Sequence, residues 1–211
     1  MDTQLQNIKN IIFDFGGVLV DLDRQRCEES FKAIGIDLNS MIDDFHQHGV
    51  LADFENGEAT PPQFFEALRN LSNGHAPSDE QIWEAWDSFL VGLPHERLDI
   101  LISLKGHYRL MLLSNTNFIH WYRAQNDLFL YRGLTVGDLF EQIFLSFEMH
   151  LQKPQPAIFE RVIEQTGIRP DETLFIDDSP VNCKAAAELG IRTFCPTTPD
   201  EWMNLFKTPR T

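Results

Sequence analysis

The sequence predicts an α/β protein built on a doubly wound parallel sheet, with a helical segment inserted near its start. Short apolar runs that are typical of buried strands recur along the chain. Helical patterns separate the later runs, and strands that alternate with helices form parallel sheets with right-handed crossovers. The predicted strands are 10–13, 108–113, 143–147, 173–176 and 192–195, and the helices between them are 118–125, 156–166 and 180–189.

The first predicted strand, 10–13, is an apolar run that ends at Asp14. The last two predicted helices end at Gly167 and Gly190. Glycine commonly terminates helices because it adopts the left-handed conformation without steric cost. These signals indicate a Rossmann-like succession of strands and helices.

Residues 22–91 contain helical patterns and no convincing strand, and they separate the first strand from the second. The clearest helices there are 24–34, 61–71 and 79–90. We therefore predict a Rossmann-like core domain, residues 1–21 and 92–211, and a helical domain, residues 22–91.

The composition indicates an acidic globular protein. Its 211 residues are 43% hydrophobic and 23% charged, and its net charge is −15. A field of that sign repels nucleic acid and anionic membrane surfaces, so neither is expected as a partner. It also repels phosphorylated molecules, so a phosphate site in this chain would need a metal ion or local positive charge.

The cysteines and the N-terminus predict a cytoplasmic protein. Cys27, Cys183 and Cys195 have no metal-ligand or redox spacing and do not suggest a disulfide framework. The first residues are polar and lack the layout of a signal peptide. A monomer is the simplest expectation.

Polar residues follow four of the predicted strands. Asp14 ends the first, Ser114 and Asn115 end the second, Lys153 follows the third, and the adjacent acids at 177–178 end the fourth. In open α/β sheets, ligands bind outside the carboxyl ends of the strands, so these residues should meet in one pocket.

The residue types point to phosphate chemistry assisted by a metal. Carboxylates that converge from Asp14, Asp177 and Asp178 repel one another unless a cation lies between them, and oxygen ligands suit Mg²⁺. One carboxylate can then attack a phosphoryl group that the metal orients. The Ser114 hydroxyl and nearby backbone N–H groups suit an anion, and Lys153 supplies positive charge.

Four segments, in order, resemble the motifs of the haloacid dehalogenase-like (HAD) superfamily. They are residues 13–21 (Phe-Asp-Phe-Gly-Gly-Val-Leu-Val-Asp), 112–115 (Leu-Leu-Ser-Asn), Lys153-Pro154 with Ile158-Phe159, and 175–179 (Phe-Ile-Asp-Asp-Ser). The resemblance spans residues 11–196. The helical insertion, 22–91, falls where that superfamily places its C1 cap. The Ser-Asn-Thr-Asn run and the double Asp further resemble bacterial α-D-glucose-1-phosphate phosphatases.

The resemblance implies a Mg²⁺-dependent phosphatase that acts on a small phosphorylated metabolite, with a sugar 1-phosphate favoured, through a covalent aspartyl-phosphate. It implies that Asp14 is the nucleophile and a metal ligand, and that the Gly16 carbonyl is a second ligand. Asp178 would bind the metal directly, and Asp177 directly or through water.

The same resemblance implies that Ser114 and Asn115 hold the phosphoryl group and that Lys153 ties it to Asp14. Asn117 and Asn182 are expected to cap helices or to support the site. His46, His48, His120 and His150 lack metal-ligand spacing and are expected at the surface or in the insertion, with His46 a candidate for substrate contact.

One position departs from the family pattern. Most family phosphatases have a second Asp two residues after the nucleophile, which acts as general acid and base, and this chain has Gly16. General acid–base catalysis is commonly worth about 10²–10⁴-fold in rate. Either the leaving group needs little protonation, which we favour, or Asp21 or Asp23 reaches into the site instead.

Two other functions remain open at this point. A metal-independent 2-haloacid dehalogenase would tolerate Gly16 because halide leaves unprotonated, but the pair Asp177 and Asp178 would then have no purpose. A non-catalytic module that binds a phosphorylated ligand or a protein would also tolerate Gly16.

Overall fold

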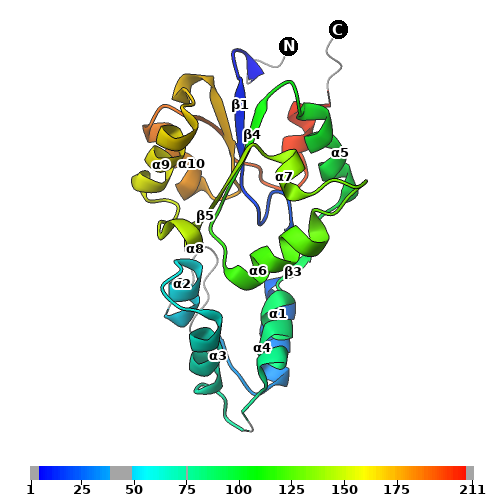
Figure 1. Cartoon of the computed structure of the whole chain (residues 1–211), viewed down its shortest axis with the longest axis vertical. Helices are drawn as coiled ribbons and strands as arrows, with labels where there is room; N and C mark the ends of the chain where they lie inside the picture. Colours follow the sequence, from blue (N-terminus) through cyan, green and yellow to red (C-terminus); the bar gives the residue numbers. More distant parts are fainter. Residues whose placement is uncertain (1–4, 39–48, 75, 208–211) are drawn as a thin grey trace.

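The computed structural model describes residues 5–38, 49–74 and 76–207. These residues form a five-stranded parallel sheet with the strand order β5-β4-β1-β6-β7 (Figure 1). The strands are β1 (Asn10–Phe13), β4 (Arg109–Ser114), β5 (Gln142–Leu145), β6 (Thr173–Ile176) and β7 (Arg192–Phe194). The central strand, β1, lies between β4 and β6, so Asp14 leaves the sheet in the middle of its carboxyl edge.

Both faces of the sheet are covered, as a doubly wound fold requires. The helices that follow the strands are α5 (His95–Leu104), α6 (Phe118–Arg123), α7 (Val136–Leu139), α8 (Ser146–Met149), α9 (Pro156–Thr166) and α10 (Pro180–Glu188). Figure 1 shows α9 and α10 on one side of the sheet and α5 and α7 on the other. Ile11 and Phe13 join one apolar cluster and Ile12 joins another, because successive strand residues point to opposite faces. The predicted fold class is confirmed.

The insertion has a separate apolar core. Its helices are α1 (Arg24–Ala33), α2 (Val50–Glu55), α3 (Pro61–Arg69) and α4 (Asp79–Asp87). They enclose a cluster of aromatic side chains that includes Phe31, Phe54, Phe64 and Trp86, and Ile119 of α6 inserts into the same cluster. The division into a core of residues 1–21 and 92–211 and a cap of residues 22–91 stays a prediction.

Two short strands join the insertion to the sheet domain. β2 (Asp21–Leu22) and β3 (Leu90–Gly92) pair antiparallel. The expectation that residues 22–91 contain no strand is therefore wrong at both ends of that segment. Strands of two and three residues are too short to produce the alternating pattern by which strands are recognised.

The structure differs from expectation at several other elements. The strand predicted at 143–147 ends at Leu145 because α8 begins at Ser146. The helix predicted at 118–125 continues as a π-helical turn, Ala124–Leu128. The helices α2, α5, α7 and α8 were not predicted from the sequence. Within the described ranges, no helix is long and apolar enough to cross a membrane.

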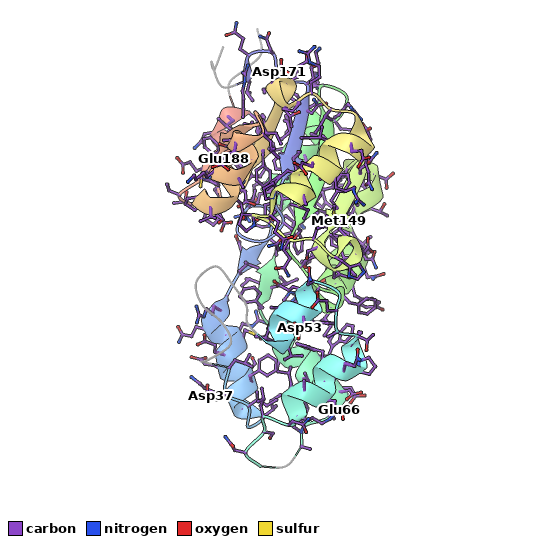
Figure 2. The ribbon with its side chains drawn as sticks, turned by 90° about the vertical axis from the view of Figure 1, so that its left-hand side faces the viewer. Asp37, Asp53, Glu66, Met149, Asp171 and Glu188 are labelled. Carbon is purple, nitrogen blue, oxygen red and sulfur yellow. The ribbon has the colours of Figure 1, made fainter. Side chains whose placement is uncertain are left out.

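A second contact joins the insertion to the sheet domain at α2 and α8. The Ser146 hydroxyl lies 2.6 Å from the Glu55 carbonyl oxygen, and His150 Nδ1 lies 3.0 Å from the Asn56 carbonyl oxygen. Figure 2 shows Asp53 of α2 and Met149 of α8 at this junction. The insertion is therefore held to the sheet domain through α2 as well as through the β2–β3 ribbon and α6.

Candidate active site

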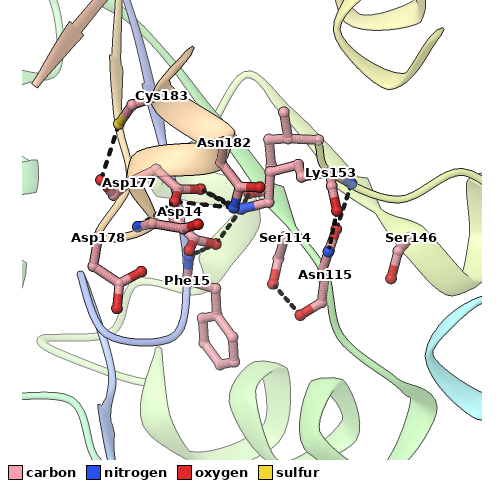
Figure 3. Close-up of polar contacts among 12 residues, drawn as sticks. Asp14, Phe15, Ser114, Asn115, Ser146, Lys153, Asp177, Asp178, Asn182 and Cys183 are labelled. Atoms are coloured by element: carbon pink, nitrogen blue, oxygen red, sulfur yellow. Dashed lines mark hydrogen bonds and ion pairs between the residues drawn. The ribbon is translucent and has the colours of Figure 1, made fainter. Parts of the chain in front are cut away.

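Asp14, Lys153 and Asp177 meet at the carboxyl edge of the sheet (Figure 3). Lys153 Nζ lies 2.7 Å from Asp14 Oδ1 and 2.7 Å from Asp177 Oδ2, and it donates to the Leu113 carbonyl oxygen at 3.1 Å. All three charged residues are buried. The backbone register explains the meeting, because Phe13 pairs with Leu112 on one side and with Ile176 on the other.

The three acids are crowded around a single buried cation. Asp14, Asp177 and Asp178 each offer a carboxylate oxygen within 4.8 Å of the others. Burial raises the pKa of Asp14 well above its usual value; Lys153 opposes this, whereas the two neighbouring carboxylates add to it. Desolvation and the charge of Asp177 also raise the pKa of Asp178. Lys153 alone therefore leaves negative charge uncompensated.

Asp177 is fully buried and its carboxylate accepts several hydrogen bonds. Oδ1 accepts from the Ser179 backbone N–H at 2.8 Å and from Asn182 Nδ2 at 3.0 Å. Oδ2 accepts from Lys153 at 2.7 Å and from Asn182 at 3.2 Å. Asp178, in contrast, is exposed. The Asp177 carboxylate is therefore occupied by N–H donors, whereas the Asp178 carboxylate is exposed to bind other groups.

Lys153 is held in place by its burial and by Asn115. Burial alone would lower the pKa of Lys153, but Asp14 and Asp177 raise it above its usual value, so the side chain carries its charge. The Asn115 side chain donates to the Lys153 carbonyl oxygen at 2.9 Å and accepts from the Lys153 N–H at 2.9 Å. This amide is thus engaged with the backbone of the lysine loop.

Ser114 is the last residue of β4 and is completely buried. Its hydroxyl donates to the Asn115 carbonyl oxygen at 3.3 Å. The loop beyond it is tied to α8, because the Thr116 N–H donates to the Ser146 hydroxyl at 2.9 Å. Asn117 then caps α6 by accepting from the His120 N–H.

Two glycines after Asp14 lie against other side chains. Gly17 has φ +75°, and a Cβ atom placed on it would lie 2.2 Å from Asp178 Oδ2. A Cβ atom on Gly16 would lie 3.0 Å from Leu22 Cδ1. Glycine at position 17 is thus what allows the Asp178 carboxylate to lie beside the first loop.

Asp21 and Asp23 have other partners. The Asp21 carboxylate binds Arg97 Nη2 at 2.7 Å, and the Asp23 carboxylate caps α1 by accepting from the Arg26 N–H at 2.9 Å. Asp21 is thus paired with α5 of the sheet domain, and Asp23 with the first turn of α1.

Some expectations about histidines meet a different outcome. His120 is buried rather than at the surface, because its Nε2 pairs with the Trp86 carbonyl oxygen at 3.0 Å. Burial lowers its pKa to about 4. His46 and His48 lie outside the described residues.

Sequence reasoning missed Arg97 and Ser146. Arg97 supports the loop after Asp14, and its partner Leu19 is 78 positions away; the partner of Ser146, Glu55, is 91 positions away. No local motif marks either residue, so no signal in the single sequence could have found them.

The doubly wound sheet thus collects one buried lysine and three carboxylates at its carboxyl edge, the convergence that the four motifs predict. The family model of haloacid dehalogenase-like hydrolases matches residues 8–190. The chain belongs to that family.

Similar proteins include enzymes with phosphate substrates. The chain is 35% identical over 196 residues to a D-ribitol-5-phosphate phosphatase of Bacteroides thetaiotaomicron, covering 92% of this chain and 95% of that protein. A crystal structure of the HAD family enzyme bt-2542 from Bacteroides thetaiotaomicron, in complex with magnesium and inorganic phosphate, has a TM-score of 0.88 at 46% identity and covers 95% of this chain and 100% of its own. A HAD-like hydrolase from Porphyromonas gingivalis has a TM-score of 0.85 at 36% identity, with coverages of 96% and 99%.

Proposed function

We propose that this protein is a Mg²⁺-dependent phosphatase that hydrolyses a small phosphorylated metabolite through an aspartyl-phosphate on Asp14. The observation that carries the proposal is the group of three carboxylates within 4.8 Å of one another around one buried lysine. Such a group needs a cation, and oxygen ligands of this kind suit Mg²⁺. The similar phosphatase and the magnesium- and phosphate-bound neighbour support it.

The chemistry of the donor set fits a divalent metal. The raised pKa values of Asp14 and Asp178 mark negative charge that the site does not neutralise by itself. Asp14, Asp178 and the Gly16 carbonyl would hold the ion directly. Asp177 would act through water, because both of its oxygens already accept N–H donors. When bound, Mg²⁺ supplies Lewis-acid charge that reduces the repulsion between a phosphoryl group and a carboxylate.

The residues of the chain then have separate tasks. An Asp14 oxygen attacks phosphorus, a bond from Asp14 to phosphorus forms, and the bond from phosphorus to the leaving oxygen breaks. Lys153 remains charged beside Asp14 and balances the phosphoryl oxygens. Ser114 would bind a phosphoryl oxygen. Asn115 would act chiefly by holding the Lys153 backbone. Water then hydrolyses the aspartyl-phosphate and releases inorganic phosphate.

The absence of an acid at Gly16 constrains the leaving group. Asp21 is paired with Arg97 and Asp23 caps a helix, which supports the view that neither replaces the missing acid. A leaving group that needs little protonation, such as the anomeric oxygen of a sugar 1-phosphate, is therefore favoured by the chemistry. The similar D-ribitol-5-phosphate phosphatase favours a polyol phosphate, so the substrate screen must contain both ester classes.

The other two functions are less well supported. A metal-free dehalogenase would leave the charge among Asp14, Asp177 and Asp178 uncompensated. Chloride release from a 2-haloacid that survives EDTA would establish it instead. A non-catalytic module would never carry phosphate on Asp14. The cap function of residues 22–91, the cytoplasmic location and the monomeric state stay predictions.

The test is a screen of sugar 1-phosphates, polyol phosphates and aryl phosphates with Mg²⁺, measuring phosphate release by the wild type and by Asp14→Asn. The variant is nearly isosteric, so it should fold and yet release no phosphate above background. Asp171→Asn is the matched control, since Asp171 is exposed at the end of the sheet domain away from the insertion (Figure 2). Mass spectrometry should detect phosphate on Asp14 after rapid quenching. A wild type that releases phosphate equally well in EDTA would refute the metal-dependent mechanism.

A further inference from the structure

The chain after Asp14 folds back on itself and brings Leu22 against Gly16. The N–H groups of Leu19 and Val20 donate to the Phe15 carbonyl oxygen at 2.9 and 2.8 Å. A Cβ atom on Gly16 would lie 3.0 Å from Leu22 Cδ1 and 3.6 Å from Cδ2. The Leu22 side chain thus lies in tight contact with the point where a side chain at position 16 would begin.

Hydrogen bonds from two distant side chains hold this loop in place. Arg97 is 2% exposed and donates to the Leu19 carbonyl oxygen at 2.9 Å and to Asp21 at 2.7 Å. The Trp202 indole donates to the Val18 carbonyl oxygen at 3.1 Å. Leu22 itself is paired with β3. The backbone cannot carry Leu22 away from Gly16 without breaking these contacts.

Leu22 is not part of the packed core. The residue is 39% exposed, whereas Val18, Leu19 and Val20 are completely buried. A large apolar side chain that stays partly exposed gives up part of the burial energy that it could contribute to folding. It stands beside Gly16, the position where the family resemblance places a general acid in most phosphatases.

We propose that Leu22 determines which leaving groups this enzyme accepts. The inference rests on the proposed phosphatase function and deepens it. The Leu22 methyl groups lie against the point where the acid's side chain would begin, so the leaving oxygen of the ester meets hydrocarbon and receives no proton from the protein. As the bond from phosphorus to that oxygen breaks, the oxygen keeps the electron pair and takes its proton from water. Esters of acidic alcohols are therefore accepted, and the apolar wall contacts the carbon that bears the leaving oxygen.

The same geometry predicts that Gly16→Asp alone restores the acid poorly. In Gly16→Asp, the new Cβ atom would lie 3.0 Å from Leu22 Cδ1, so we expect Leu22 to compete with the new carboxyl group for the space beside the leaving oxygen. In the double variant Gly16→Asp/Leu22→Ala, the introduced carboxylic acid has room. It gives its proton to the leaving oxygen as the ester bond breaks, and it takes a proton back from the water that hydrolyses the aspartyl-phosphate.

The experiment is a double-mutant cycle with Gly16→Asp, Leu22→Ala and the combination, assayed on a series of phosphate esters whose leaving groups differ in acidity. Measured as kcat, the combination should exceed Gly16→Asp by about 10²-fold or more on alkyl phosphates, the rate range of general acid catalysis. Its rate should depend less on the acidity of the leaving alcohol. Leu22→Ala alone should raise KM and keep the steep dependence.

Leu130→Ala is the matched control, because Leu130 is an exposed leucine outside the site, 54% exposed, and it should change neither kcat nor KM. The role of Leu22 would be overturned if the effects of the two single substitutions on kcat simply multiplied in the combination, or if Leu22→Ala left KM unchanged. The phosphatase function would stand in either case. A wild type that releases no phosphate from any ester would instead remove the proposed function and this inference together.

Discussion

Replacing Gly17 by alanine should disable the metal site while leaving the protein folded. The residue has φ +75°, and the added Cβ atom would lie 2.2 Å from Asp178 Oδ2 and 2.7 Å from its Cγ. Placing a non-glycine residue in the left-handed conformation costs about 1–2 kcal/mol. That cost should appear in the free energy of unfolding, measured by denaturant titration.

The larger effect concerns Asp178. Cβ atoms essentially never approach another heavy atom closer than 3.0 Å, so a carboxylate now at 2.2 Å must retreat. A misplacement of about 1 Å in a catalytic constellation can lower the rate by about 10²-fold. We therefore expect weaker Mg²⁺ binding by calorimetry and a rise in the Mg²⁺ concentration needed for half-maximal phosphate release.

Gly133→Ala separates the two effects. Gly133 has φ +76°, nearly the same backbone strain, but a Cβ atom there would have no neighbour within 4 Å. The control should lose comparable stability and keep its affinity for Mg²⁺. If Gly17→Ala bound Mg²⁺ as tightly as Gly133→Ala, Asp178 would not be the metal ligand that we propose.

Three other outcomes are expected. His120 takes up its proton near pH 6.5 in the unfolded state but only near pH 4 in the folded state. The free energy of unfolding should therefore fall by up to about 3 kcal/mol as the pH falls from 6.5 to 4. Subtracting the denaturation profile of His120→Gln from that of the wild type should reveal this loss. Gly57→Ala should destabilise the junction of α2 with α8, because its Cβ atom would lie 2.0 Å from the Phe147 carbonyl oxygen; hydrogen exchange that stays as slow as in the wild type there would contradict this. Asn115→Ala removes two hydrogen bonds to the Lys153 backbone and should lower the free energy of unfolding by about 1–3 kcal/mol. It should also lower kcat. Stopped assays with and without denaturant can separate the loss of stability from the loss of activity.

The convergence of the site residues could be predicted because it follows from topology. Asp14 and Asp177 each end an apolar run, and in a parallel sheet such ends share one edge. Lys153 could be added because its Pro154 and its place after a strand match a motif. Lys153 lies 2.7 Å from Asp14 and from Asp177, and its catalytic role stays a prediction.

The short elements could not be predicted, because their formation depends on partners rather than on their own residues. β2 exists because Leu22 meets Leu90 across the start and end of the insertion. His120 was predicted at the surface or in the insertion. It is buried, because its neighbour Ile119 packs into the apolar core of the insertion. Periodicity describes one element and carries no information about which other element will cover it.

The sequence by itself determined the fold class, the family and the set of charged groups at the carboxyl edge, because each is written in contiguous residues whose pattern has a local physical cause. Only the tertiary structure decided what those groups have left to bind. It pairs Asp21 with Arg97, commits Asn115 to the lysine loop, saturates Asp177 with N–H donors and leaves Asp178 exposed. These pairings join residues that are mostly tens of positions apart in the sequence. Many residues have suitable chemistry for each pairing, and only the packing of the chain selects one of them.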